Sequence, residues 1–335
     1  MSSHPFIDTE SFYLSPDISS TSLTDPATGI IPAPTLSKLK NLGPARLRDM
    51  RTQNSSMQIL SHLPIDTSPK QCQKLNDALA SSIVMNQDRF AGLALLPCWD
   101  AKSAAEELGR CVSKYRFVGG VLGFRRGEGK ESDGVGGAGV GGLFEELWKV
   151  AERYRVPVFL RPLFPSKEQV AQFESPSPGV LPASITGALF SNLYTTHAVS
   201  PILLVRLYLS GAFDRHPNLR LVLSQNAHSI PPLLPRILNV VAALPSNLKP
   251  TRGFLDVWQH NIFITTADTL DVPSMRALLK QTPVDRVLGS GIMTELKESD
   301  VLAKDEWERV GWRNAEALFG LRGGAERAKR EKSSY

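Results

Sequence analysis

The strongest constraint on the fold is a regular alternation of short β-rich runs with longer helical patterns along all 335 residues. Such alternation is typical of a parallel sheet built from βα units. The β-rich runs cover residues 5–8, 57–62, 90–97, 117–123, 156–161, 219–225, 261–266 and 285–290. Eight strands, each followed by a helix, close into a (β/α)8 TIM barrel, and the chain is long enough for one such barrel with insertions.

Interruptions of this alternation indicate where insertion loops and a tail lie. We expect one barrel domain over residues 1–321, with insertion loops at about 9–34, 125–142 and 162–192, and a basic, disordered tail at 322–335. The first and third of these loops follow strands, so they should reach over the C-terminal face, where barrels build substrate pockets. The glycine-rich second loop lacks the spacing of a phosphate-binding loop.

Composition excludes several classes of protein. The net charge is +5, but the tail from Arg322 to Lys332 carries +3 of it, so a nucleic-acid partner is not indicated. No apolar run approaches the 18 residues of a membrane span, and the first ten residues lack the features of a signal peptide. We therefore expect a cytoplasmic protein without a membrane partner. The three cysteines have no metal-ligand spacing and are expected to be reduced.

Several segments resemble the amidohydrolase-related family that includes aromatic-acid decarboxylases and aminocarboxymuconate semialdehyde decarboxylase. They occur in the family's order at residues 45–61 (ARLRDMRTQNSSMQILS), 76–97, 104–110 (AAEELGR), 156–162 (VPVFLRP), 210–217 (SGAFDRHP), 219–237 and 314–321 (NAEALFGL). The resemblance implies an amidohydrolase-type barrel whose chemistry lies at the C-terminal ends of the strands. It also implies a homodimer, which the sequence itself does not show.

The resemblance also implies metal ligands, and this chain departs from them. After the first strand the family carries an acidic or histidine ligand followed by a histidine, and here Glu10 could serve as the first whereas Phe12 cannot serve as the second. The family's histidine after the fifth strand is replaced by Arg161, which has no lone pair to donate. A catalytic zinc needs about three protein ligands. We therefore predict no metal and no other cofactor.

The ligand positions that the resemblance implies after the sixth and eighth strands also hold other residues. After the sixth strand Gln225 replaces a histidine, while His228 stands where the family has glutamate. After the eighth strand residues 290–293 (SGIM) contain no carboxylate. His228, Arg161 and Glu10 are therefore the candidate catalytic residues, with His228 as an acid or base and Arg161 as an anion-binding group. An ion pair between Glu10 and Arg161 that only fills the site is the alternative.

Five residues are candidates for contacting the substrate, namely Gln225, Asn226, His197, Trp99 and Phe12. For Trp99 and His228 a purely structural role is equally consistent with the sequence, and for His197 a structural role is slightly favoured. Asp100 is more simply explained as the N-cap of the helix predicted at 101–114. The remaining histidines, at positions 4, 62, 216 and 260, are expected to lack special partners.

Three functions are consistent with these residues. The first is a metal-independent, decarboxylase-like carbon–carbon lyase that acts by acid–base chemistry on a small aromatic or polyketide-like acid. The second is a cyclase, isomerase or lactone hydrolase in the inherited pocket. The third is a non-catalytic relative that binds a ligand or a partner. The first is favoured. The polar and charged residues at the former ligand positions count against the third, because a decayed site has no need for a new charge.

Overall fold

The computed structural model describes residues 6–16, 18, 33–124, 144–164, 185, 186, 189, 193, 197, 200–227 and 229–321. Eight parallel strands follow one another in chain order, which confirms the predicted barrel. The strands are β1 Phe6–Tyr13, β2 Ser55–His62, β3 Phe90–Leu96, β4 Gly119–Phe124, β5 Val158–Pro162, β6 Leu221–Leu223, β7 Ile262–Thr265 and β8 Val287–Leu288.

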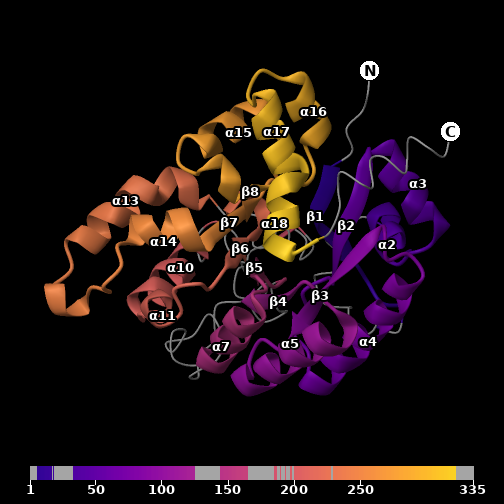
Figure 1. Cartoon of the computed structure of the whole chain (residues 1–335), viewed down its shortest axis with the longest axis horizontal. Helices are drawn as coiled ribbons and strands as arrows, with labels where there is room; N and C mark the ends of the chain where they lie inside the picture. The colour runs from indigo at the N-terminus through magenta and orange to yellow at the C-terminus, as the bar shows by residue number, and fades with distance from the viewer. Residues whose placement is uncertain are drawn as a thin grey trace, which may run out of the picture.

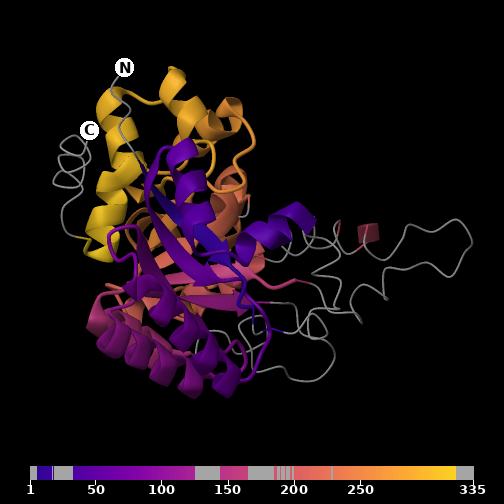
Figure 2. The same cartoon turned by 90° about the vertical axis from the view of Figure 1, so that its right-hand side faces the viewer.

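Helices surround the strands on the outside of the barrel (Figure 1). Seen from the side as well, the magenta helices and the yellow C-terminal helices lie at opposite ends of the molecule (Figure 2). The α-helices are α2 Ala33–Leu39, α3 Pro44–Thr52, α4 Pro69–Val84, α5 Ala101–Tyr115, α7 Glu145–Tyr154, α10 Ser200–Leu209, α11 Ala212–Arg215, α12 Ser224–Ala227, α13 Ile230–Ala242, α14 Phe254–Asn261, α15 Val272–Leu279, α16 Met293–Glu298, α17 Lys304–Glu308 and α18 Asn314–Phe319.

The middle of the first strand is bonded to the segment that follows the last strand. The Thr9 amide donates to the Gly289 carbonyl at 3.0 Å, and the Thr9 hydroxyl donates to the same oxygen at 2.9 Å. The Ser290 hydroxyl donates to the Asp8 carboxylate at 2.6 Å. These bonds join β1 to the segment after β8 and nearly close the barrel.

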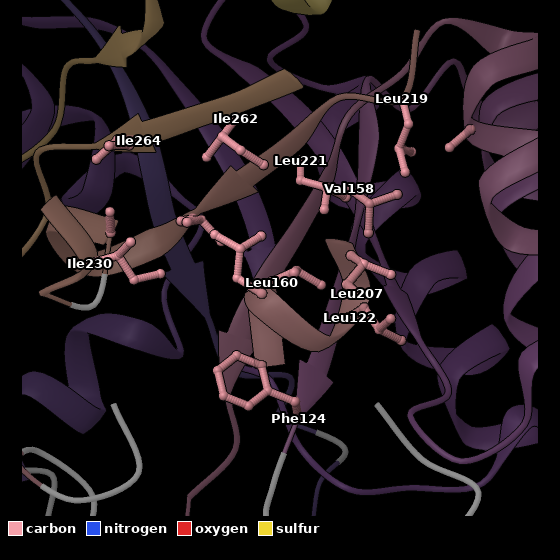
Figure 3. Packing of buried hydrophobic residues seen from close by; sticks show 14 of the residues in the cluster. Leu122, Phe124, Val158, Leu160, Leu207, Leu219, Leu221, Ile230, Ile262 and Ile264 are labelled. Atoms are coloured by element: carbon pink, nitrogen blue, oxygen red, sulfur yellow. The ribbon is translucent and has the colours of Figure 1, made fainter. Parts of the chain in front are cut away.

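Alternating strand residues build two apolar layers, as the two-residue period of a strand requires. Inward-facing residues fill the barrel: Ile7, Met57, Ile59, Leu93, Val121, Phe159, Val222, Phe263 and Leu288. Their neighbours face outward and pack under the helices. Figure 3 shows this outer layer, with Leu122, Leu160 and Leu207 of α10 close together. The interior is thus a packed core rather than a pore.

The structure corrects the predicted start of the chain. The first strand was expected to end at Asp8 and to lead into a loop over 9–34, but β1 continues to Tyr13. Its pairing with β2 shifts register between Asp8 and Ser11. An irregularity of this kind breaks the strict alternation of inward and outward residues, which explains why the sequence suggested a loop. The helix α2, which begins at Ala33, overlaps only the last two residues of the expected loop.

Two further expectations can be compared with the structure. The Asp100 carboxylate accepts the Ser103 amide at 2.9 Å and caps α5, as predicted. Cys72, Cys98 and Cys111 are buried free thiols. Among the described residues, no helix is both long enough and apolar enough to cross a membrane.

The expectation that the remaining histidines lack special partners was wrong for three of them. His62 is fully buried, accepts the Ser15 amide at Nε2 (3.1 Å) and lies 2.7 Å from the Leu63 carbonyl through Nδ1. His216 lies between the Glu145 and Glu152 carboxylates at 2.8 and 3.1 Å. The His260 ring contacts Asp256, one turn earlier on α14, at 2.9 Å. His4 lies outside the described residues.

Candidate functional site at the barrel mouth

The predicted site residues Glu10 and Arg161 meet at the C-terminal mouth of the barrel. All eight strands are parallel, so the ends of β1 and β5 lie on the same face. Arg161 Nη1 and Glu10 Oε1 form an ion pair, with only 15% and 2% of the two side chains exposed. The Arg161 guanidinium also lies over the Phe12 ring, 3.8 Å from its centroid. Phe12 therefore packs against the Arg161 cation.

The second oxygen of Glu10 is bonded as well. Oε2 accepts the Thr265 hydroxyl of β7 and the backbone amide of Gln225, the latter at 3.3 Å. Gln225 has a left-handed backbone with φ of 49°, which turns the chain after β6. Residues at the ends of β5, β6 and β7 thus converge on the Glu10 carboxylate of β1.

Arg161 stays positively charged at neutral pH. Burial lowers its pKa to about 9, and the Asp268 carboxylate opposes this shift. Asp268 follows β7 and is itself influenced by its surroundings: burial raises its pKa, whereas the charges of His197 and Arg161 lower it. At the mouth, the Glu10 carboxylate therefore contacts the Arg161 guanidinium directly, and the Asp268 carboxylate interacts with it electrostatically.

The space beneath this ion pair is small. A cavity of about 10 Å³ lies there, close to the room that one water molecule needs. Its walls combine the mouth residues with the top of the barrel core: Thr9, Glu10, Ser11, Phe12, Ile59, Ser61, Leu93, Val121, Phe159, Arg161 and Ser224. This cavity is too small for a ligand of aromatic size.

The donor groups around this site do not fit a divalent metal ion. Both Glu10 oxygens are engaged, and the Arg161 guanidinium places a positive charge against one of them. Within the part of the chain that the structure describes, no group of three or more His, Cys, Asp or Glu residues could hold a metal. The prediction of a metal-free site remains a prediction, and its physical reason is this donor set.

Of the other predicted site residues, some lie outside the described part of the chain and some lie away from the ion pair. His228 lies outside the described residues, as does the side chain of Asn226 in α12. Gln225 contacts Glu10 only through its backbone amide. Trp99 donates from its indole nitrogen to Asp66 at 2.6 Å and does not line the cavity beneath the ion pair. Its role in substrate binding stays a prediction.

The sequence analysis missed two residues that lie near this mouth. The Ser229 hydroxyl lies 2.7 Å from Nδ1 of the predicted residue His197. Asp268 interacts electrostatically with both His197 and Arg161. A signal for Asp268 existed in the sequence, because it follows the C-terminal end of a barrel strand, where catalytic residues gather. Ser229 had no such signal beyond its place after β6.

Comparison with known proteins identifies the relatives of this chain. A family model described as amidohydrolase matches residues 44–321, most of the chain. The chain belongs to the amidohydrolase family. Among curated relatives of this amidohydrolase, decarboxylase orsB of Emericella nidulans is 30% identical over 298 residues, covering 84% of this chain and 86% of the relative. The gamma-resorcylate decarboxylase of Rhodococcus jostii is 31% identical over 309 residues, covering 85% and 89%.

Solved structures share the fold of this amidohydrolase. A putative amidohydrolase from Staphylococcus aureus superposes with a TM-score of 0.75 at 25% identity, over 95% of this chain and all of the other. A dihydroxybenzoic acid decarboxylase from Polaromonas, with bound manganese and 2-nitroresorcinol, gives 0.76 at 23% identity, over 97% and 99%. That enzyme holds a metal, whereas the described residues of this chain place an arginine and a glutamate together at the mouth.

Proposed function

We propose that this amidohydrolase is a decarboxylase-like carbon–carbon lyase that acts on a small hydroxylated aromatic acid without a metal ion. The observation that carries the proposal is the buried Arg161–Glu10 pair at the mouth of a barrel whose relatives are named as decarboxylases. A metal in such an enzyme supplies fixed positive charge for substrate oxygens. Arg161 supplies fixed positive charge from the protein itself, held in place by Glu10 and Phe12.

Arg161 is proposed to bind the oxygen of a phenolate next to the reacting carbon. A guanidinium presents several N–H donors in one plane, which suits an anionic oxygen. If it bound the departing carboxylate instead, it would stabilise the substrate more than the transition state and slow the reaction. The partly exposed side of Arg161 therefore fits the phenolate, with the carboxylate directed away from the guanidinium.

The reaction needs one proton for the ring carbon. That carbon accepts the proton, the bond to the carboxylate breaks, its electron pair restores the aromatic ring, and CO₂ leaves. His228 is our candidate donor from the sequence.

The proposal is tested by CO₂ release from 2,6-dihydroxybenzoate, comparing wild type with Arg161→Ala and Arg286→Ala. Arg286 is a matched control, since its guanidinium also lies over a phenylalanine ring, that of Phe263 at 4.8 Å, but it precedes β8 at the opposite end of the strands. We expect Arg161→Ala to lower kcat/KM by roughly 10²–10³-fold, as the loss of a charge-stabilising donor does, and Arg286→Ala to leave it unchanged. Equal activity of the two variants would refute the role of Arg161.

A further inference from the structure

A serine and a histidine form a close pair beside the barrel mouth, outside the Arg161–Glu10 site. Ser229 Oγ and His197 Nδ1 are separated by 2.7 Å, and both side chains are only partly buried. With the ring proton on Nε2, Nδ1 accepts the serine hydroxyl proton. This is the contact by which a histidine activates a serine for nucleophilic attack.

A third group completes the arrangement. The Asp268 carboxylate interacts electrostatically with His197. A carboxylate near the ring of an activating histidine stabilises the imidazolium that forms when the serine proton is transferred. Asp268 has a left-handed backbone with φ of 65°, so its position depends on a turn that few non-glycine residues adopt. The three groups come from three separate segments of the chain.

The backbone at Ser229 also suits a nucleophile. Ser229 has φ of 62° and ψ of 15°, a strained conformation for a serine, and it is the N-cap of α13. Its side chain does not accept a helix amide, as a capping serine ordinarily does. The next amide belongs to Ile230, in the first turn of α13, and prolines 231 and 232 have none. Catalytic serines at strand–turn–helix junctions use this following amide for the oxyanion.

We propose that Ser229, His197 and Asp268 form a second catalytic centre that hydrolyses esters through a covalent acyl-serine. Ser229 Oγ attacks the carbonyl carbon and its proton passes to His197 Nδ1. The tetrahedral intermediate collapses as the C–O bond breaks, and the leaving alcohol or phenol takes the proton from His197. Water then attacks the acyl-serine, with His197 again accepting and returning one proton, to release the acid and restore the serine.

The proposed substrate class is an aryl ester or lactone of a hydroxylated aromatic acid. This choice rests on the proposed lyase function, because ester hydrolysis would release the acid that Arg161 is placed to bind. The ester chemistry itself does not depend on that function. A simple ester without a carboxylate therefore tests it independently of decarboxylation.

The test uses p-nitrophenyl acetate with the full chain, and measures the pre-steady-state release of p-nitrophenolate. We expect a burst of one equivalent per chain, and a mass increase of one acetyl group on Ser229 after acid quenching. Ser229→Ala should lower the acylation rate by at least about 10³-fold and His197→Gln by about 10²-fold. Ser103→Ala is the matched control, because Ser103 is a helix-start serine bonded to Asp100 rather than to histidine, and it should retain the burst.

Further variants separate this centre from a structural contact and from the lyase site. Ser229→Gly removes the nucleophile while relieving the left-handed strain, so a folded, inactive glycine variant supports the proposal. Asp268→Asn should slow acylation about tenfold and shift its pH profile. A wild-type chain that hydrolyses the ester but releases no CO₂ from 2,6-dihydroxybenzoate would defeat only the lyase proposal. Acylation at another residue, or a wild-type rate in Ser229→Ala, would overturn the proposed centre.

Discussion

Two buried glutamate–arginine pairs occupy different regions of this amidohydrolase. Glu10 and Glu107 each have 2% of the side chain exposed, and each pairs with an arginine, Arg161 at the barrel mouth and Arg110 one turn along α5. The pKa of Arg110 is raised, chiefly by hydrogen bonding to Glu107. Burial lowers the pKa of Arg161. The surroundings therefore favour the charged form of the arginine in the helix pair and disfavour the charged form of the arginine at the mouth.

The difference lies in the surrounding partners. Glu107 accepts Arg110 Nε and Nη2 at 2.8 Å each and the Asn76 amide at 2.6 Å, while Arg110 also reaches the exposed Asp77 at 2.7 Å. Arg161 lies against an aromatic ring and one ion-pair partner. A buried charge whose hydrogen-bonding groups all have partners, as in the Glu107–Arg110 pair, stabilises the fold. A buried charge with few partners, such as Arg161, lowers stability but can bind a ligand.

Removal of Glu107 is expected to give the largest change in stability. Glu107→Ala leaves Arg110 and Asn76 without their shared acceptor, so the free energy of unfolding should fall by about 3–5 kcal/mol. Urea denaturation at neutral pH measures it. Glu106→Ala on the same helix is the control, because Glu106 is exposed and lies 3.9 Å from Lys102, and its loss should cost less than about 1 kcal/mol. Equal losses would show that the helix network is not the stabilising one.

His62 extends the comparison to a buried group that is kept neutral. Burial lowers its pKa to about 4, below the ordinary 6.5, so the unfolded chain takes up the proton first as the pH falls. Stability from His62 is therefore present above pH 6.5 and should be lost by about 3 kcal/mol on going to pH 4. His62→Gln, which cannot titrate, should lose that part of the pH dependence. Unfolding curves with the same pH dependence in both proteins would contradict the burial argument.

The paired replacement Glu10→Gln with Arg161→Met should distinguish the two ion pairs directly. Replacing a buried ion pair with uncharged groups is often neutral or stabilising by about 1–4 kcal/mol. Arg161 has one ion-pair partner and an aromatic ring beside it, so we expect a gain of about 2 kcal/mol at the mouth. The matched replacement of Glu107 by Gln with Arg110 by Met should lower stability, since the guanidinium bonds to Asp77 and to residue 107 are lost. A loss of stability at the mouth as large as in α5 would make the mouth pair a structural feature.

The smallest expected effect concerns the start of the helix that carries Glu107. Asp100→Ala removes the carboxylate that accepts the Ser103 amide, which should lower the free energy of unfolding by about 1 kcal/mol. Asp88→Ala, an exposed position outside any helix, should stay within about 0.5 kcal/mol of wild type. Thermal denaturation of both variants checks the difference. An unchanged midpoint in Asp100→Ala would mean that the packing of α5 does not depend on its cap.

The barrel could be predicted from strand periodicity, and the meeting of Glu10 with Arg161 from the ligand positions that the family resemblance implies at the strand ends. Alternating β and helical patterns locate the strand ends, and parallel strand ends must share one face. The extension of β1 to Tyr13 could not be predicted, because a register shift hides its alternation. The contact between Ser229 and His197 joins residues 32 positions apart, and no periodic pattern in the sequence brings the two together.

The same limit explains the partners of buried histidines. His216 lies between Glu145 and Glu152, which are more than 60 residues away in the sequence. Such contacts depend on how α7 packs beside α11, and residue patterns within one helix carry no information about it. Asp268 is an intermediate case: its place after β7 was visible, but its closeness to Arg161 required the three-dimensional arrangement.

We propose that Arg161, held by Glu10, supplies at the mouth the positive charge that a metal ion supplies in a metal-dependent decarboxylase. The most direct test is CO₂ release from 2,6-dihydroxybenzoate by chelator-treated protein, before and after addition of Mn²⁺, with the metal content measured in the same samples. We predict activity without bound metal and a change of less than about twofold on adding Mn²⁺, since the guanidinium already supplies the charge. Activity that disappears with the metal and returns with one Mn²⁺ per chain would contradict the account.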